Sequence, residues 1–527
     1  MTEFTATAVL VRSILRRDRV RIGVWVAGIV ALAVSSAAGV AGIYPTDEDL
    51  QRAAALVEGN AAAIAFNGPP QGLETLGGRV AFETGSFTLV MVGLMSLFML
   101  SRHTRAEEES GRLELVRAAV VGRHAPMAAA LIVVVGMNAV VGAALAAGYA
   151  AIGLDGPGSL TFGLSVAAVG TVFAGITAVA AQVTENTRVA SGLAGLAVGV
   201  SYTVRAVGDV GDGTLSWLSP LGWGQKMRPF AGDVWWPLVV PLAFFAGCLW
   251  LAAVLASRRD VGAGLVAPRR GPAEAKAGLG TPFGLAVRLQ RGSLVGWGSG
   301  VLALGLVYGS VANDVEDFVA DLDESVRDII ARGGASIVDS FLGTTLLILA
   351  LIGSGFAVGA VQRLRSEETA LRAEPVLATP VSRWRWVASH MAVAVGGSAV
   401  VLAAGGLGLG LAYGVVLGDL GQVPRRMADA LGYLPAVAVM AGVALALFGL
   451  LPRAVVAVWG FLAACFVIGF FAELLDLPGW LRAVSPYEHT PLAPAEGIRA
   501  LPLLAMAALA ITLAAAGARG FRTRDVG

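Results

Sequence analysis

Closely spaced charges interrupt an otherwise apolar sequence at residues 104–123, which read TRAEEESGRLELVRAAVVGR. The acidic and basic side chains recur at a spacing that lets them pair along one surface of a helix. Arg105 can reach Glu108, and Glu108 can reach Arg112. The segment therefore predicts a short, ion-paired surface helix that could serve as a docking surface for a soluble protein.

The same charge pattern returns 260 residues later as RSEETALRAEPVLATPVSR, residues 365–383. A loop that only sets membrane topology needs positive charge, not a repeated pair of acids. The repetition therefore favours a docking surface that is presented twice. The matching charges are Arg105 with Arg365, Glu107 with Glu367, Glu108 with Glu368, Arg112 with Arg372, Glu114 with Glu374 and Arg123 with Arg383.

Other chemistry finds little support in the sequence. A phosphate-binding loop needs Gly-Lys followed by Ser or Thr, but Lys226 follows Gln225 and Lys276 follows Ala275. The four histidines lack the spacing of metal ligands, and the two cysteines lie inside apolar runs. We therefore expect no metal, no ATPase site and no catalytic residues in this chain.

Composition places the chain in a membrane. It has 527 residues, of which 56% are hydrophobic and 14% charged, and its mean hydropathy is +0.74. Soluble proteins have about 25% charged residues. A span needs about 20 apolar residues. Twelve spans are predicted at 22–43, 86–101, 125–151, 159–182, 189–207, 236–256, 294–312, 341–361, 387–416, 430–450, 454–472 and 500–518.

The distribution of arginine sets the predicted orientation. With the N-terminus inside, most Lys and Arg fall in inner loops and most Asp and Glu in outer loops, as the positive-inside rule requires. Both termini are then cytoplasmic, and the protein is a multi-pass protein of the cell inner (plasma) membrane. The first residues, MTEFTATAVLVRSILRRDR, predict a retained amphipathic helix at the inner surface.

The chain divides into two similar halves. We predict a first six-span half at 1–257, a basic, Gly- and Pro-rich cytoplasmic linker at 258–280, and a second half at 281–527. A second pair of similar segments is SWLSPLGW at 216–223 and WLRAVSPYEHTP at 480–491. The expected fold is an all-α polytopic transmembrane helical protein, with twelve spans in two parallel six-span repeats.

These features resemble an ABC type-2 membrane permease, in particular the actinobacterial class of polyketide antibiotic exporters. The resemblance rests on LVRSILRRDR, on R-x-E-E-x-S-G-R-x-E-L with its closing VVGR, and on S-P-L-G-W. It implies that the helix between spans two and three of each half is a coupling helix, seated in a separate ATPase subunit. That partner, expected in two copies, would hold ATP and Mg.

The resemblance assigns partner coupling to Arg105, Glu107, Glu108, Arg112 and Glu114, and to Arg365, Glu367, Glu368, Arg372 and Glu374. The second copy departs from the pattern, because Leu371 stands in place of Gly111 and Pro375 in place of Leu115. Its helix is therefore expected to be shorter.

The family also implies short re-entrant helices, for which 216–230 and 480–497 fit, and a pathway lined by spans two and five of each half. Within the outer loop 313–340, the spacing of apolar residues in NDVEDFVADLDESVRDIIARGG (313–334) predicts an outer amphipathic helix. Candidate pathway residues are Phe87, Met91, Met95, Phe98, Phe461, Cys465 and Phe466.

The predicted function is the permease subunit of an ATP-driven ABC exporter that moves hydrophobic small molecules, such as antibiotics or drugs, out of the cell. Lipid bilayer is an expected partner and nucleic acid is not. Two alternatives stay open. One is an ABC permease for a lipid or cell-envelope precursor. The other is an ion-coupled secondary transporter, which would need buried carboxylates in mid-span, whereas Glu473 and Asp476 fall at an outer end.

Overall fold

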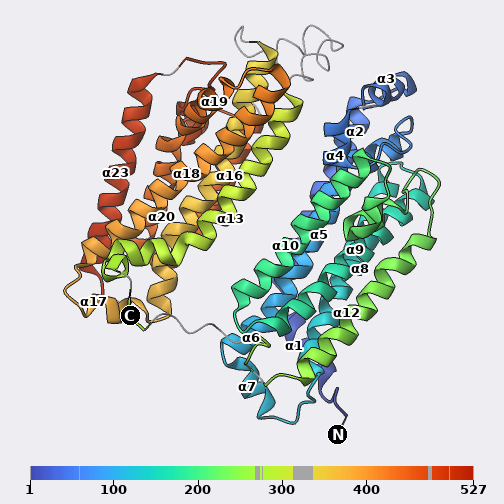
Figure 1. The fold of residues 1–527 in the computed structure, drawn as a ribbon, viewed down its shortest axis with the longest axis horizontal. Helices are drawn as coiled ribbons and strands as arrows, with labels where there is room; N and C mark the ends of the chain where they lie inside the picture. The colour runs from blue at the N-terminus through green and yellow to red at the C-terminus, as the bar shows by residue number, and fades with distance from the viewer. Residues whose placement is uncertain are drawn as a thin grey trace. The chain divides into compact units, whose positions relative to one another are not determined.

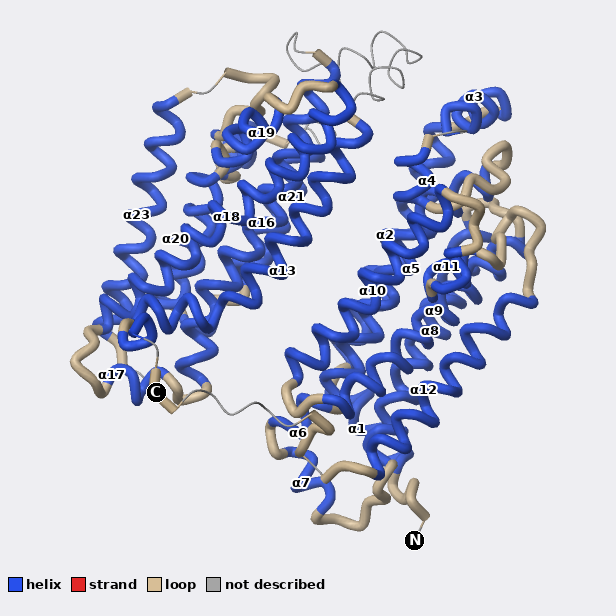
Figure 2. The backbone as a smooth tube through the Cα atoms, in the orientation of Figure 1, coloured by secondary structure: helices blue, strands red, loops and turns tan. Residues whose placement is uncertain are grey.

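A computed structural model describes residues 2–57, 60–260, 262–266, 273–275, 277–312, 336–472, 477–497 and 499–525. These residues form helices and loops, with no strand among them (Figures 1 and 2). The chain splits into two compact units, Met1–Gly271 and Pro272–Gly527, and each unit is described by itself.

The first unit is built on one central helix, α9, which packs against α5, α8, α10 and α12. Within this unit, α1, α6 and α7 lie at one end, and α3 and α4 lie at the other (Figure 1). The helices are α1 (Thr7–Arg17), α2 (Arg19–Ile43), α3 (Asp47–Val57), α4 (Ala61–Asn67), α5 (Leu76–His103), α6 (Arg105–Glu109), α7 (Arg112–Arg117), α8 (Ala125–Ala151), α9 (Gly156–Val183), α10 (Thr187–Val210), η1 (Leu215–Leu218), α11 (Pro220–Gln225), η2 (Trp236–Leu238) and α12 (Val239–Ser257).

Side-chain caps set where the long helices of this unit begin. The Thr75 hydroxyl accepts a hydrogen bond from the Gly78 amide, and Asp155 does the same for Gly158. Asn186 accepts from two amides at the start of α10. The cap at Thr75 starts α5 ten residues before the apolar run at 86–101, so span two is longer than the hydropathy pattern alone predicts.

The second unit centres on α16 and α18, with α13 packed along α18 and α23 packed along α20. Within it, α17 and the C-terminus lie at one end and α19 at the other (Figure 1). Its helices are η3 (Ala277–Gly280), α13 (Pro282–Val311), α16 (Ile337–Thr369), α17 (Ala373–Leu377), α18 (Arg383–Leu417), α19 (Gln422–Leu431), α20 (Leu434–Leu450), η5 (Pro452–Ala454), α21 (Ala457–Phe471), α22 (Gly479–Arg482), η6 (Pro486–His489) and α23 (Ala500–Thr523).

Eleven helical segments of the described chain are long and apolar enough to cross a bilayer. Six are in the first unit, as predicted, and five in the second. The expected span 454–472 corresponds to α21, which is apolar but has 15 residues and so falls short of the usual length. The predicted count of twelve is therefore not reached by this criterion.

Several predicted local features can be compared with the structure. The predicted N-terminal helix is present as α1. The Gly-rich run 387–416 forms one unbroken helix, α18, of 35 residues. The segments 216–230 and 480–497 contain only short helices. The outer helix predicted over 313–334 lies outside the described part of the chain, as do Glu473 and Asp476.

Glycine lets α8 and α9 approach closely. A Cβ built on Gly142 would lie 2.4 Å from the Gly163 carbonyl oxygen, and one on Gly163 would lie 2.2 Å from the Gly142 oxygen. In a bilayer, where burial of apolar surface no longer drives helices together, such small residues allow the backbone contact that holds them.

This contact makes a stability prediction. Gly142→Ala should lower the melting temperature of the protein in mild detergent, because the added methyl group overpacks the crossing at a cost of roughly 1–3 kcal/mol. Gly136→Ala, on the same helix with nothing within 4 Å of its Cβ, is the matched control and should leave the melting temperature unchanged or raise it. Equal effects of the two substitutions would contradict the prediction.

Candidate functional site

The predicted docking helix of the first unit is two short helices joined by a sharp turn. α6 ends at Glu109 and α7 begins at Arg112, with Gly111 between them at a φ of 72°. In the second unit α16 continues to Thr369, and Leu371 occupies the same left-handed region at a φ of 56°. This conformation costs leucine roughly 1–2 kcal/mol. The second unit therefore has the same turn as the first, although leucine replaces the glycine.

Glu108 is the centre of the charged motif in the first unit. Its side chain is 10% exposed and forms an ion pair with Arg105, which is fully buried. Both of its oxygens also accept hydrogen bonds from Arg259, at 2.8 and 2.9 Å. Arg259 follows the end of α12, so Glu108 joins the motif to the last helix of the unit.

Glu368 takes the same place in the second unit. Its side chain is 1% exposed, and Arg365 donates to it at 3.0 Å. Arg524, which follows the end of α23, contacts its two oxygens at 2.9 and 2.8 Å. The two buried carboxylates thus have equivalent partners within their own units.

The neighbouring acids, Glu107 and Glu367, form a second equivalent pair of contacts. Arg112 lies 3.8 Å from Glu107, and Arg372 lies 3.0 Å from Glu367. The predicted pairing of Glu108 with Arg112 is therefore wrong, because Glu108 is turned inward to the arginine after α12. Glu107 also accepts a hydrogen bond from Arg17 of α1 at 2.8 Å.

A cluster around Asp18 fixes α1 against the same end of α5. Asp18 lies between α1 and α2 and contacts Arg102 at 3.2 Å and Arg21 at 3.0 Å. Burial acts to raise the pKa of Asp18, but the hydrogen bond and charge of Arg102, with the neighbouring cations, bring that pKa below its ordinary value. The carboxylate therefore stays charged and holds the surface helix beside the motif.

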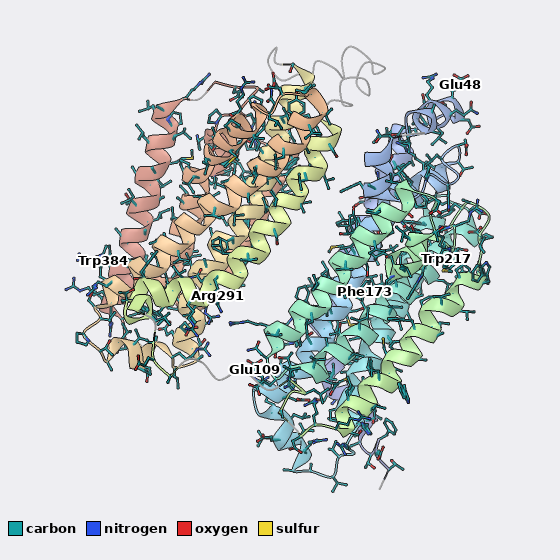
Figure 3. All side chains as sticks on the ribbon, viewed as in Figure 1. Glu48, Glu109, Phe173, Trp217, Arg291 and Trp384 are labelled. Atoms are coloured by element: carbon teal, nitrogen blue, oxygen red, sulfur yellow. The ribbon has the colours of Figure 1, made fainter. Side chains whose placement is uncertain are left out.

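Exposure separates the predicted coupling residues into two groups. Arg105, Glu107, Glu108, Glu367 and Glu368 are buried or nearly so, and Arg365 is partly buried. Arg112, Glu114, Arg372 and Glu374 are exposed at the tips of the motifs. Glu109 is also exposed and lies at the motif end of the unit (Figure 3). The exposed residues are the ones best placed to contact another protein.

The predicted pathway residues also divide by exposure. Met95 of α5 and Cys465 of α21 are completely buried in the cores of their own units. The ring of Phe98 is half exposed and stacks on Trp25 at 6.3 Å. The remaining members are Phe87 and Phe466, which are about half exposed, and Met91 and Phe461, which are partly buried.

A separate cavity of about 1260 Å³ opens in the first unit between α8 and α12. Leu131 of α8 and Phe245 and Leu249 of α12 line its apolar part, and Glu108 and Arg259 lie at its charged end. The cavity therefore combines a long apolar wall with polar groups at one end, which is a surface suited to an amphiphilic molecule.

Buried acids within the helices have basic partners. Asp209, near the end of α10, is 1% exposed and lies 3.6 Å from the fully buried Arg205. Ser216 donates to the same carboxylate at 2.5 Å. Asp429 pairs with Arg426 at 3.1 Å in α19. The sequence reasoning overlooked these pairs. Among the described residues no group of three or more His, Cys, Asp or Glu could hold a metal ion.

Comparison with known proteins decides the family. The chain is 41% identical over 99% of its length to the multidrug efflux system permease protein Rv1217c of Mycobacterium tuberculosis (strain ATCC 25618 / H37Rv), and covers 96% of that protein. Residues 279–522 match the family described as the C-terminal domain of the multidrug efflux system permease Rv1217c. The chain belongs to this multidrug efflux permease family. It is a multi-pass membrane protein, with eleven membrane-length helices among its described residues.

Sequence reasoning missed two arginines of the permease site, Arg259 and Arg524. A signal for them was present, because the tetrapeptide R-D-V-G occurs twice, at 259–262 and at 524–527, just after the last span of each half. The first copy falls in the predicted linker, 258–280. In the structure its arginine instead packs against the helices, donating to the Gln182 side chain of α9 at 2.8 Å.

The burial of Glu108 predicts a large effect on the stability of the permease. Glu108→Gln should lower its free energy of unfolding by roughly 3 kcal/mol or more, because Arg105 and Arg259 lose their shared counter-charge. Glu114→Gln, on the exposed face of α7, should change it by no more than about 0.5 kcal/mol. Denaturant or thermal unfolding in mild detergent measures both, and an equal loss in the two variants would contradict the burial argument.

Proposed function

We propose that this permease is the membrane part of an ATP-driven ABC exporter, and that its two charged motifs dock two copies of a separate ATPase. The observation that carries the proposal is the repeated motif. Each copy has a base held by equivalent ion pairs and a tip that points away from its unit. A helical tip that is exposed and present twice is suited to binding a protein partner.

The docking surface consists of the exposed tips. In the first unit it includes Glu109, Arg112 and Glu114, together with Leu115, whose side chain is 78% exposed. In the second unit the exposed tip consists of Leu371, which stands in place of Gly111, with Arg372, Glu374 and Pro375. Each tip pairs an apolar side chain with charges of both signs, which is a composition suited to a groove on a soluble protein. ATP and Mg would be bound by that partner.

The proposed topology places both motifs and both termini in the cytoplasm of a cell with the permease in its inner membrane. It takes α21 as an additional span, which brings the number of spans to twelve. The two units then become parallel six-span repeats. The equivalent ion pairs at Glu108 and Glu368, each to the arginine after the last helix, support this correspondence.

The proposed cargo is a hydrophobic or amphiphilic small molecule, such as a drug or antibiotic. The relative in Mycobacterium tuberculosis is named a multidrug efflux permease, and the apolar cavity between α8 and α12 supports a cargo of this class. Whether polyketides are included, or whether a lipid or envelope precursor is moved instead, is a question for cargo assays. An ion-coupled transporter is the rival if no ATPase binds.

The docking proposal predicts a result for purification. The tagged permease, extracted from its native membrane in mild detergent, should carry two ATPase subunits by native mass spectrometry and hydrolyse ATP. Glu114→Arg combined with Glu374→Arg should remove the ATPase, because the reversed charges repel the groove that received the acids.

The matched control is Glu48→Arg. Glu48 is 82% exposed on α3, at the opposite end of the first unit from Glu109 (Figure 3), so its reversal should leave the complex intact. A wild-type permease that purifies without any ATPase would sink the proposal and make ion coupling the leading idea. Retention of the ATPase by the double variant would show that it docks elsewhere.

A further inference from the structure

The arginine that follows the last helix of each unit makes an unusual set of contacts. α12 ends at Ser257 and α23 at Thr523, and Arg259 and Arg524 follow these ends within two residues. Each guanidinium group spans both oxygens of a buried carboxylate in the charged motif. A paired contact of this kind fixes orientation as well as distance, which a lysine cannot do.

Both arginines also reach a third helix. Arg259 donates to Gln182 near the end of α9 at 2.8 Å. The guanidinium group of Arg524 lies 5.0 Å from the ring centroid of Phe448, near the end of α20. In each unit a single side chain therefore contacts the motif, follows the last helix and reaches a third helix, α9 in the first unit and α20 in the second.

A second contact fastens the far end of each motif to the same helix. Arg123, which closes the first motif, donates to the Ala256 carbonyl oxygen at 3.0 Å. Its counterpart Arg383 donates to the carbonyl oxygens of Phe521 and Arg524 at 3.3 and 2.7 Å. These carbonyls belong to helix C-termini, where the backbone lacks partners and favours a positive charge.

Neighbouring arginines show that these contacts are selective. Arg258 and Arg522 stand beside the two fastening residues in sequence, and both are exposed. An arginine that served only to keep a loop in the cytoplasm would be exposed to solvent, as Arg258 and Arg522 are. Arg259 and Arg524 are instead held, with side chains 8% and 20% exposed.

We propose that Arg259 and Arg524 are positioning residues that fasten the last helix of each unit to its charged motif, so that motif and helix move as one body. Motion delivered to the exposed tips then reaches α12 and α23 directly. α12 forms one wall of the cavity, so its displacement would change the shape of that cavity. The source of the motion rests on the proposed function, but the fastening does not.

Pulsed electron paramagnetic resonance tests the fastening without any partner. Cys248 and Cys465 are replaced by alanine, and spin labels are placed on cysteines at Leu115, on the tip of α7, and Leu242, on α12; both positions are exposed. The label-to-label distance distribution should be narrow and should broaden in Arg259→Gln. Arg258→Gln, the adjacent exposed arginine, should leave it unchanged.

Arg259→Lys keeps the charge but can make only one of the two hydrogen bonds, so it should broaden the distribution less. If Arg259→Gln does not fold, the distance distribution of Arg259→Lys is compared with that of the wild type instead. The second unit offers an independent copy, with labels at Glu374 and Leu504, Arg524→Gln as the variant and Arg522→Gln as its control. A distribution unchanged by the Gln and Lys variants would overturn the proposal.

Drug-stimulated ATP hydrolysis by the purified complex tests the transmission. Arg259→Gln should retain its ATPase subunits, and drug should stimulate its ATP hydrolysis, relative to the variant's own basal rate, several-fold less than in the wild type. Stimulation at the wild-type level, or loss of the ATPase subunits themselves, would overturn transmission through this arginine. If the wild-type permease binds no ATPase, the proposed function fails on its own, and the spin-label distances still decide the fastening.

Discussion

A carboxylate withdrawn from water must be given a fixed positive partner, and both charged motifs of this permease depend on that constraint. Glu108 and Glu368 are buried at the base of their motifs, each with an arginine from its own helix and another from beyond the last helix of its unit. The cost of burial ties the position of the motif to the position of that last helix. The contact is thus both a structural requirement and a mechanical connection.

This arrangement gives each motif two parts with different roles. The base is internal and holds the motif to its unit, whereas the tip beyond Gly111 or Leu371 is exposed and free to meet a partner. The left-handed residue between them turns the chain away from the axis of the preceding helix. In the second unit leucine keeps that turn at an energetic cost, which indicates that the surrounding contacts determine the conformation.

The two units use the same plan with different amounts of helix. The first unit has six membrane-length helices with α9 at their centre, while the second has five and the shorter α21. Close helix crossings are made by small residues, as between Gly142 and Gly163. The two units therefore differ in their helices, while each keeps the ion pair between its motif and the arginine after its last helix.

The sequence by itself determined the class of the protein, because a composition so poor in charge and runs of apolar residues of this length have no soluble alternative. It also located the two motifs, and eleven of the predicted spans fall in helices of membrane length, since hydropathy and charge are local properties. The length of α5 was missed because a threonine cap, not hydropathy, sets its start.

Only the tertiary structure decided which charges of the motif are available. Arg105, Glu108 and Arg112 look alike as a pattern, yet the structure buries Arg105 and nearly buries Glu108, while it exposes Arg112. The difference depends on Arg259, which lies about 150 residues away in sequence and at 2.8 Å in space. Helical spacing predicts ion pairs within one helix. The partner of a buried carboxylate can instead come from any of the helices that pack around it.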